Sequence, residues 1–304
     1  MKAPIRAASS VPYERVWAGN SRIKGIIALT HPTAVIIFSL VTWLLAAVTL
    51  AKFPSALLSV SLTLAMAGAQ ASVGVFNEVF DWKLDKEAKP WRALPAGMIS
   101  PAAAAVMASV LLCVGLLFAA SISFLTMLLL LAGAGMGILY SAVFKRTILS
   151  WLPYAVCYPT FPVWVLVAVG QFDQRILLIY LLASPFAMAV HLCNQLRDFE
   201  QDEAWGIRGM VQHLGKSASV ALCFGLVLFS PIPFLILAGF SSQPADFVVL
   251  LLAGLLHWCL TLPVYRSRLG LPDAMVFRSL FRRLQFTGPL MLLVWYSVFL
   301  TTLR

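Results

Sequence analysis

Residues 77–92 read NEVFDWKLDKEAKPWR, a densely charged stretch in a chain that carries few charges. The stretch follows directly on an apolar run over 55–76, so it lies where a membrane-crossing helix would reach water. Asp81 and Asp85 are four residues apart, which places both carboxylates on one face of a helix. Stacked like charges repel by about 0.2–0.5 kcal/mol in water and by more beside hydrocarbon. The stretch therefore predicts a positively charged partner for these carboxylates.

The rest of the chain has the composition of an integral membrane protein. Of its 304 residues, 61% are hydrophobic and 11% are charged, and the mean hydropathy is +0.90. These values exclude a soluble domain, whose surface must face water. An α-helix needs about 20 apolar residues to cross the hydrocarbon of a bilayer. We expect a single all-α membrane domain over 1–304 with nine spans, at 26–51, 55–76, 101–122, 124–144, 149–170, 176–195, 217–239, 246–265 and 284–302.

The Lys and Arg residues predict the orientation of these spans, because basic segments resist translocation and gather in cytoplasmic loops. With the N-terminus inside, 19 of the 22 Lys and Arg fall on the cytoplasmic side. We therefore expect residues 1–25 and the long charged loops to face the cytoplasm, in a bacterial inner membrane. The formal charge of +10 sits at the membrane edges, with no basic patch interleaved with aromatics, which argues against nucleic acid as a partner.

Residues 194–216, NQLRDFEQDEAWGIRGMVQHLGK, repeat the polar pattern of the opening stretch. The pattern N-x-x-x-D-x-x-x-D occurs at the cytoplasmic ends of the second and sixth expected spans, and its copies lie 117 residues apart: Asn77, Asp81 and Asp85, then Asn194, Asp198 and Asp202. One such motif would suit a solvated membrane edge. Two copies in register favour a shared site at the interface of two related halves.

Carboxylate and amide oxygens at this spacing suit Mg²⁺, a hard cation that is bound through one or two carboxylates together with substrate phosphates. These six residues are therefore candidate Mg²⁺ ligands, and a phosphate or diphosphate is the expected substrate group. Arg offers a planar fork and Lys a point charge to phosphate oxygens. The candidate diphosphate-binding residues are Lys89, Arg92, Lys145, Arg146 and Arg197. For Lys145 and Arg146, a topogenic role at the end of a span is the alternative.

With these motifs in place, the chain resembles the UbiA superfamily of intramembrane prenyltransferases. The family's first motif, N-D-x-x-D-x-x-x-D followed by K/R-P-x-R-P-L-P-x-G-x-I-S, stands here as NEVFDWKLDKEAKPWRALPAGMIS. The second, D-x-x-x-D followed by Gly, stands as DFEQDEAWG. Glu78 replaces the usual Asp and Ala93 the usual Pro, while Tyr140 precedes Lys145 by five residues and not by the four seen in some branches. The resemblance covers nearly the whole chain.

The resemblance implies a helical bundle around a central cavity, in which Mg²⁺ held by both acidic motifs grips an isoprenyl diphosphate. It implies transfer of a polyprenyl group to an aromatic, quinone-precursor-like or other lipid-precursor acceptor, with no obligatory protein partner. Lys145 would stabilise the departing diphosphate, and Asp198 would assist acceptor deprotonation as well as bind metal, so both are candidate catalytic residues. NQLRD resembles the menaquinone branch and KPWRALPAGMIS the chlorophyll synthase and archaeal ether-lipid branches, so the acceptor stays open.

Other functions and roles stay open at this point. A UbiA-type terpene cyclase would use the same diphosphate site without an external acceptor. A cation or phosphate-metabolite transporter would place ionisable residues near the middle of several spans, whereas here the carboxylates cluster at one edge. His191, in the sixth span, is either a site residue or a polar contact between helices, and His31, before Pro32, predicts an irregularity in the first span. The basic segment 265–283 predicts a lipid-contacting surface helix, with a cap over the site as the alternative.

Overall fold

The structure is a computed structural model that describes residues 22–239, 243–267 and 273–303, and these ranges contain helices and no strand. Most of the expected cytoplasmic segment 1–25 thus lies outside the described residues. The α-helices are α2 (Arg22–Leu29), α3 (Pro32–Leu50), α4 (Ala56–Ala88), α5 (Pro101–Ile122), α6 (Phe124–Ala142), α7 (Leu152–Ala168), α8 (Ile179–Arg197), α9 (Phe199–Ala204), α10 (Met210–Leu214), α11 (Lys216–Phe229), α12 (Ile232–Ala238), α13 (Pro244–Thr261), α14 (Pro263–Ser267) and α15 (Asp273–Leu303). Three short 3₁₀ helices complete the set: η1 (Phe144–Arg146), η2 (Ile148–Trp151) and η3 (Gln174–Leu178).

Eight helical segments in the described ranges are long and apolar enough to cross a membrane. They are Pro32–Leu50, Ala56–Glu87, Pro101–Ile122, Phe124–Ala142, Ile148–Ala168, Gln174–Arg197, Lys216–Leu237 and Pro244–Tyr265. These correspond to the first eight expected spans. The ninth expected span, 284–302, lies within α15, which is not among the eight. The chain is therefore an all-α integral membrane protein, and the count of nine spans is approximate.

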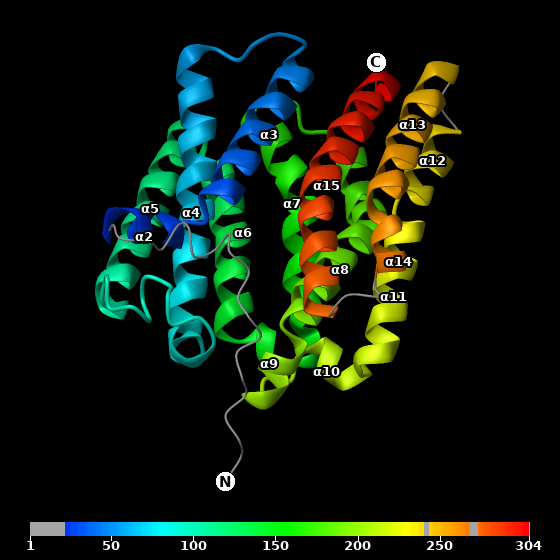
Figure 1. The fold of residues 1–304 in the computed structure, drawn as a ribbon. Coiled ribbons are helices and arrows are strands. Elements are labelled where there is room, and N and C mark those ends of the chain that lie inside the picture. Colours follow the sequence, from blue (N-terminus) through cyan, green and yellow to red (C-terminus); the bar gives the residue numbers. More distant parts are fainter. Residues whose placement is uncertain (1–21, 240–242, 268–272, 304) are drawn as a thin grey trace.

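The long helices stand roughly parallel in one bundle, with α2 lying across its flank (Figure 1). The connection between α4 and α5 lies at the lower end of the bundle in this view, together with the short helices α9 and α10. Both acidic motifs lead into this end, which we call the motif end.

Glycines allow α4 and α5 to pack closely, as is common where membrane helices associate through small residues. A Cβ on Gly68 would lie 2.6 Å from the Leu111 carbonyl oxygen, and one on Gly115 would lie 2.9 Å from the Ala65 carbonyl oxygen. Neither position can therefore carry a side chain without moving a backbone. This contact fixes α4, the helix that carries the first motif.

The first expected span is broken at His31, which confirms the predicted irregularity. His31 has φ 51° and ψ 60°, in the left-handed region, and separates α2 from α3. Pro32 supports the break, because proline lacks the backbone N–H that would continue the helix and disfavours an α-helical conformation in the residue before it.

The described part of the basic segment 265–283 is not a separate surface helix. Residues 273–283 form the first turns of α15, and Val276, Phe277 and Leu280 are fully buried there. They pack in a hydrophobic cluster with residues of α8 and α11. Val276, Phe277 and Leu280 thus face the protein core, although Met275 is exposed, which contradicts the expectation of a helix lying free on the lipid surface.

Candidate functional site

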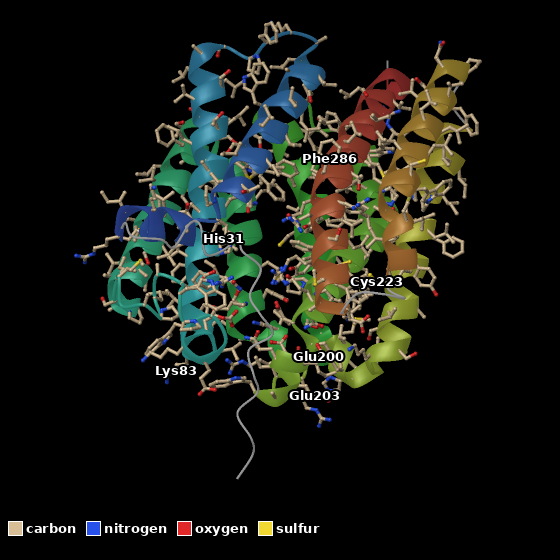
Figure 2. The ribbon with its side chains drawn as sticks, in the orientation of Figure 1. His31, Lys83, Glu200, Glu203, Cys223 and Phe286 are labelled. Atoms are coloured by element: carbon tan, nitrogen blue, oxygen red, sulfur yellow. The ribbon has the colours of Figure 1, made fainter. Side chains whose placement is uncertain are left out.

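A cavity of about 470 Å³ lies within the bundle, lined by residues of α3, α4, α6, α7, α8, α9 and α15. All six predicted metal ligands line it: Asn77, Asp81, Asp85, Asn194, Asp198 and Asp202. The fold thus brings together two motifs that are 117 residues apart in the chain. In Figure 2 polar side chains gather in the lower half of the bundle, with Lys83, Glu200 and Glu203 at the motif end. His31 lies about half-way up.

The first motif lies on one continuous helix, as its spacing predicts. α4 extends past the apolar run to Ala88, so Asn77, Asp81 and Asp85 share its cavity face. The Asn77 side-chain amide donates to Ser141 Oγ on α6 at 3.0 Å, which leaves its carbonyl oxygen available as a ligand.

Lys145 is the positive partner of Asp81. It comes from η1, directly after α6, and its Nζ lies 2.8 Å from Asp81 Oδ2. Burial alone would lower the pKa of Lys145, but the charges of Asp81 and Asp202 outweigh burial and raise it, so this ammonium stays protonated. Arg146, its neighbour, is not among the cavity-lining residues.

Arg92 is the partner of Asp85, and it also binds Glu78. Arg92 Nη1 lies 2.9 Å from Asp85 Oδ2 and 2.7 Å from Glu78 Oε1, while Lys89 Nζ lies 3.6 Å from Asp85 Oδ1. Glu78 is only 4% exposed and does not line the cavity. Glu78, the residue that departs from the family pattern, therefore lies behind the cavity wall and holds Arg92 in place on that wall.

The second motif departs from the helical spacing that its sequence suggests. α8 ends at Arg197 and α9 begins at Phe199, so Asp198 lies at the junction with φ −106° and ψ 14°. The second copy therefore does not lie on one continuous helix, as the first copy does. The junction turns Asp198 beside Arg197, whose Nη2 lies 2.6 Å from Asp198 Oδ2.

The two aspartates of the second motif have opposite electrostatic surroundings. Burial raises the pKa of Asp198, but the Arg197 guanidinium outweighs it and holds that pKa well below its usual range. Burial raises the pKa of Asp202 to about 6. The negative charges of Asp198 and Asp81 also raise this pKa, whereas the positive charge of Lys145 lowers it. Of the two carboxylates, Asp202 is thus the one that takes up a proton more readily.

Three tyrosines in successive ring contacts form part of the wall next to the second motif, with Tyr140 edge-on to Tyr154 and Tyr154 stacked on Tyr158. Their ring centroids are 5.2 Å apart for Tyr140 and Tyr154 and 5.8 Å apart for Tyr154 and Tyr158. Asn194 donates to the Tyr154 hydroxyl at 3.2 Å, while the Tyr140 hydroxyl has no hydrogen-bond partner in the described part of the chain. Tyr154 and Tyr158 were not predicted as site residues. Their four-residue spacing, one turn apart in an apolar span, was the available signal.

His191 does not line the cavity. It is fully buried, its Nε2 lies 3.1 Å from Ser150 Oγ, and its ring centroid lies 5.0 Å from that of Tyr154. These contacts match the alternative in which His191 is a polar contact between helices. Gln195, one turn further on, accepts a hydrogen bond from the Val211 backbone N–H at 3.2 Å and so ties α8 to α10.

α15 contributes Arg278, Phe281 and Gln285 to the cavity wall, and none of them was predicted as a site residue. Arg278 belongs to the basic segment 265–283, whose alternative interpretation was a cap over the site. Among the described residues the wall therefore carries five Lys or Arg side chains and four aspartates: Lys89, Arg92, Lys145, Arg197 and Arg278 against Asp81, Asp85, Asp198 and Asp202. This excess of positive charge suits an anionic ligand.

The donor set fits a hard divalent cation. All six predicted ligands carry oxygen donors on one cavity, the type that Mg²⁺ prefers. Within residues 22–239, 243–267 and 273–303, no three His, Cys, Asp or Glu side chains lie close enough together to hold a metal. The reason is visible in the ion pairs, because three of the four aspartates are each turned towards a basic side chain.

Comparisons with known proteins agree with this geometry. The sequence profile of the UbiA prenyltransferase family matches residues 35–281. A digeranylgeranylglyceryl phosphate synthase of Natronomonas pharaonis is 26% identical over 224 residues, which are 71% of this chain and 79% of that protein.

Solved structures share the fold. A UbiA homologue from Archaeoglobus fulgidus bound to GPP and Mg²⁺ has a TM-score of 0.67 at 18% identity, over 91% of this chain and 99% of that one. The apo structure of a UbiA homologue from Aeropyrum pernix K1 has a TM-score of 0.66 at 16% identity, over 83% of this chain and 94% of that one.

Proposed function

Because this chain belongs to the UbiA prenyltransferase family, we propose that it transfers a polyprenyl group from an isoprenyl diphosphate, with Mg²⁺, to an aromatic or other lipid-precursor acceptor. The observation that carries the proposal is the shared cavity. Both acidic motifs and five basic side chains lie on its wall, as an Mg²⁺–diphosphate group requires.

The diphosphate would bind at the polar part of the cavity. Lys89, Arg92, Lys145 and Arg197 line it there and already hold three of the aspartates. When a diphosphate and cations enter, these side chains can exchange a carboxylate for phosphate oxygens, which offer the same charge-assisted contacts. Arg146 was also predicted to bind phosphate, but it is not among the residues that line the cavity.

The metal would be held by the six oxygen-bearing residues of the two motifs. When bound, Mg²⁺ supplies positive charge that stabilises the departing diphosphate. Lys145 adds a fixed positive charge in the same place, because its buried ammonium stays protonated.

The prenyl chain would occupy the apolar part of the cavity. Its wall includes Phe38 on α3, Met66 on α4, Leu130 on α6, and Phe161 and Trp164 on α7. Side chains of this kind exclude water, which would otherwise capture an allylic cation before the acceptor does. Tyr158 contacts Phe38 of this apolar part, and Tyr154 accepts a hydrogen bond from Asn194 of the second motif. These rings thus connect the two regions, and their negative ring faces can stabilise positive charge on the prenyl group.

The proposal also concerns the chemical class of the acceptor. The relative from Natronomonas pharaonis is named for a glyceryl phosphate product, which favours a lipid precursor with a phosphate group. The positive charge on the wall, which includes Arg278, suits such an acceptor as well as a carboxylate-bearing aromatic. Both classes therefore belong in the test.

The test incubates the purified protein with Mg²⁺ and radiolabelled geranyl, farnesyl, geranylgeranyl and longer diphosphates. The acceptors are a hydroxybenzoate, a dihydroxynaphthoate and a monoprenylated glycerol phosphate. We expect a prenylated product that requires Mg²⁺ and disappears in the Asp81→Ala, Asp198→Ala double variant. Asp173→Ala is the matched control, because Asp173 pairs with Arg175 outside the cavity wall. A double variant as active as the parent contradicts the proposal, and diphosphate release with cyclic hydrocarbon and no acceptor product identifies a terpene cyclase.

A further inference from the structure

His31 lines the cavity and has a positive φ, a backbone conformation that is unfavourable for a residue other than glycine. It is one of two non-glycine residues with positive φ among those described, the other being Ala51 at a helix end. Such backbone conformations persist only where the surroundings hold them in place, and they concentrate at functional sites. Here the elbow between α2 and α3 directs the imidazole to the cavity wall, and its side chain is 42% exposed.

α4 faces the His31 ring with a glycine, Gly74, and therefore with no side chain at that point. Gly74 is one turn before Glu78 on α4, and a Cβ there would lie 2.8 Å from His31 Cδ2 and 3.2 Å from the Thr30 carbonyl oxygen. Any larger residue at position 74 would push the elbow and its histidine away from the cavity wall.

A buried carboxylate orients the ring. His31 Nε2 lies 3.1 Å from Glu78 Oε1, and the same oxygen lies 2.7 Å from Arg92 Nη1. Among the described residues Nε2 has no partner with hydrogen-bond geometry, so the Glu78 carboxylate acts on the ring as a nearby negative charge. A carboxylate beside Nε2 favours the tautomer that carries its proton there, which leaves the lone pair on Nδ1.

We propose that His31 is the base that removes the proton from the prenyl acceptor, and that Glu78 orients it for this step. The inference rests on the proposed function, since it concerns the same reaction. The acceptor atom forms a bond to C1 of the prenyl group, while the bond between C1 and the diphosphate oxygen breaks and that oxygen keeps the electron pair. The acceptor's proton passes to Nδ1, the resulting imidazolium is stabilised by the Glu78 carboxylate, and the proton then leaves to solvent.

Three of the four aspartates on the wall are occupied by basic side chains, and the fourth, Asp202, is a predicted metal ligand at the motif end. Asp81 is held by Lys145, Asp85 by Arg92, and Asp198 by Arg197. Among the cavity-lining residues that the structure describes, His31 is the one histidine. It also lies higher in the bundle than Lys83, Glu200 and Glu203 at the motif end (Figure 2), and Glu78 links it to Arg92, so it would lie beside the end of the diphosphate that carries C1.

The primary test compares His31→Asn with His213→Asn in the full-length protein in lipid nanodiscs. Asn tolerates positive φ better than most residues, so the elbow is expected to hold. His213 lies on α10, outside the cavity wall. We expect kcat for transfer to fall about 100-fold or more in His31→Asn, with Mg²⁺-dependent binding of a geranylgeranyl thiolodiphosphate analogue unchanged within about twofold. His213→Asn should behave like the parent.

A second variant separates a chemical role from a structural one. His31→Gly accepts the positive φ and leaves a ring-sized space, so added imidazole should restore transfer by about tenfold or more. Transfer by His31→Asn at the parental rate overturns the proposal. So does the loss of analogue binding together with transfer, or a His31→Gly variant that imidazole does not restore. A parent that shows no Mg²⁺-dependent transfer to any acceptor contradicts the proposed function itself.

Discussion

At the scale of single residues, Glu78 shows how a departure from a family pattern can be explained by its contacts. Its carboxylate is buried behind the cavity wall and contacts both Arg92 and His31. The extra methylene of Glu, compared with Asp, extends its reach from the α4 backbone to both partners. Glu78 is therefore a positioning residue, and its position in the motif does not make it a metal ligand.

Glu78→Gln should destabilise the fold and weaken donor binding. Removing the charge breaks a buried ion pair, but Arg92 keeps Asp85 as a partner, so we expect a loss of about 1–3 kcal/mol in the free energy of unfolding. The measurement is thermal or denaturant unfolding in detergent, with analogue binding alongside. Glu78→Asp, which restores the family pattern, is the matched control and should lose less. Equal unfolding curves for Glu78→Gln and the parent would show that this ion pair carries no stability.

Asp202 is expected to make binding at the proposed metal site sensitive to pH. Its pKa is raised to about 6 by burial, and Mg²⁺ requires the ionised carboxylate. Below about pH 6 a proton competes with the metal, so Mg²⁺ affinity should fall, by up to about tenfold per pH unit, and should level off above pH 7. Calorimetric titration with Mg²⁺ from pH 5 to pH 8 measures this. Asp202→Asn should bind more weakly with a flatter profile below pH 7, and an unchanged profile would remove Asp202 from the metal set.

At the scale of helices, the two copies of one sequence pattern adopt different structures. α4 continues as a helix through Asp81 and Asp85, whereas the second copy breaks between α8 and α9 at Asp198. The sequence predicts spans and faces well because hydrophobic length and helical spacing decide them. It does not predict this break, which is accompanied by a contact that only the fold brings together, the hydrogen bond from the Val211 backbone of α10 to Gln195 of α8.

The packing of α4 on α5 gives a test of how the first motif is positioned. Gly68→Ala should destabilise the fold, because its Cβ would meet the Leu111 carbonyl oxygen at 2.6 Å. The cost of such overpacking is about 1–3 kcal/mol. Gly133→Ala on α6 is the control, since no neighbouring atom lies within 4 Å of a Cβ there, and Ala should stabilise that helix by up to about 1 kcal/mol. The measurement is the melting temperature of both variants and the parent in the same detergent. Equal shifts for Gly68→Ala and Gly133→Ala would contradict the close packing of α4 on α5.

At the scale of the whole molecule, the bundle gathers residues from distant parts of the chain around one cavity. Sequence reasoning identified the membrane class, eight spans that the structure describes, and the six residues of the two motifs that line the cavity. It did not identify Tyr154, Tyr158 or Arg278, because these lie in segments whose composition suits lipid contact or topology equally well. Which way such side chains face is decided by the packing of α7 and α15 against the rest of the bundle.

The central claim is that both motifs hold one diphosphate across the cavity, and a double-mutant cycle tests it most directly. The measurement is Mg²⁺-dependent binding of the geranylgeranyl thiolodiphosphate analogue to the parent, Asp81→Asn, Asp198→Asn and the double variant. Because the two residues would act on the same ligand, we predict a coupling energy of about 0.5–3 kcal/mol. The Asp81→Asn, Asp173→Asn pair should be additive within about 0.5 kcal/mol. If the binding effects of Asp81→Asn and Asp198→Asn are also additive within about 0.5 kcal/mol, the two residues do not share one diphosphate site.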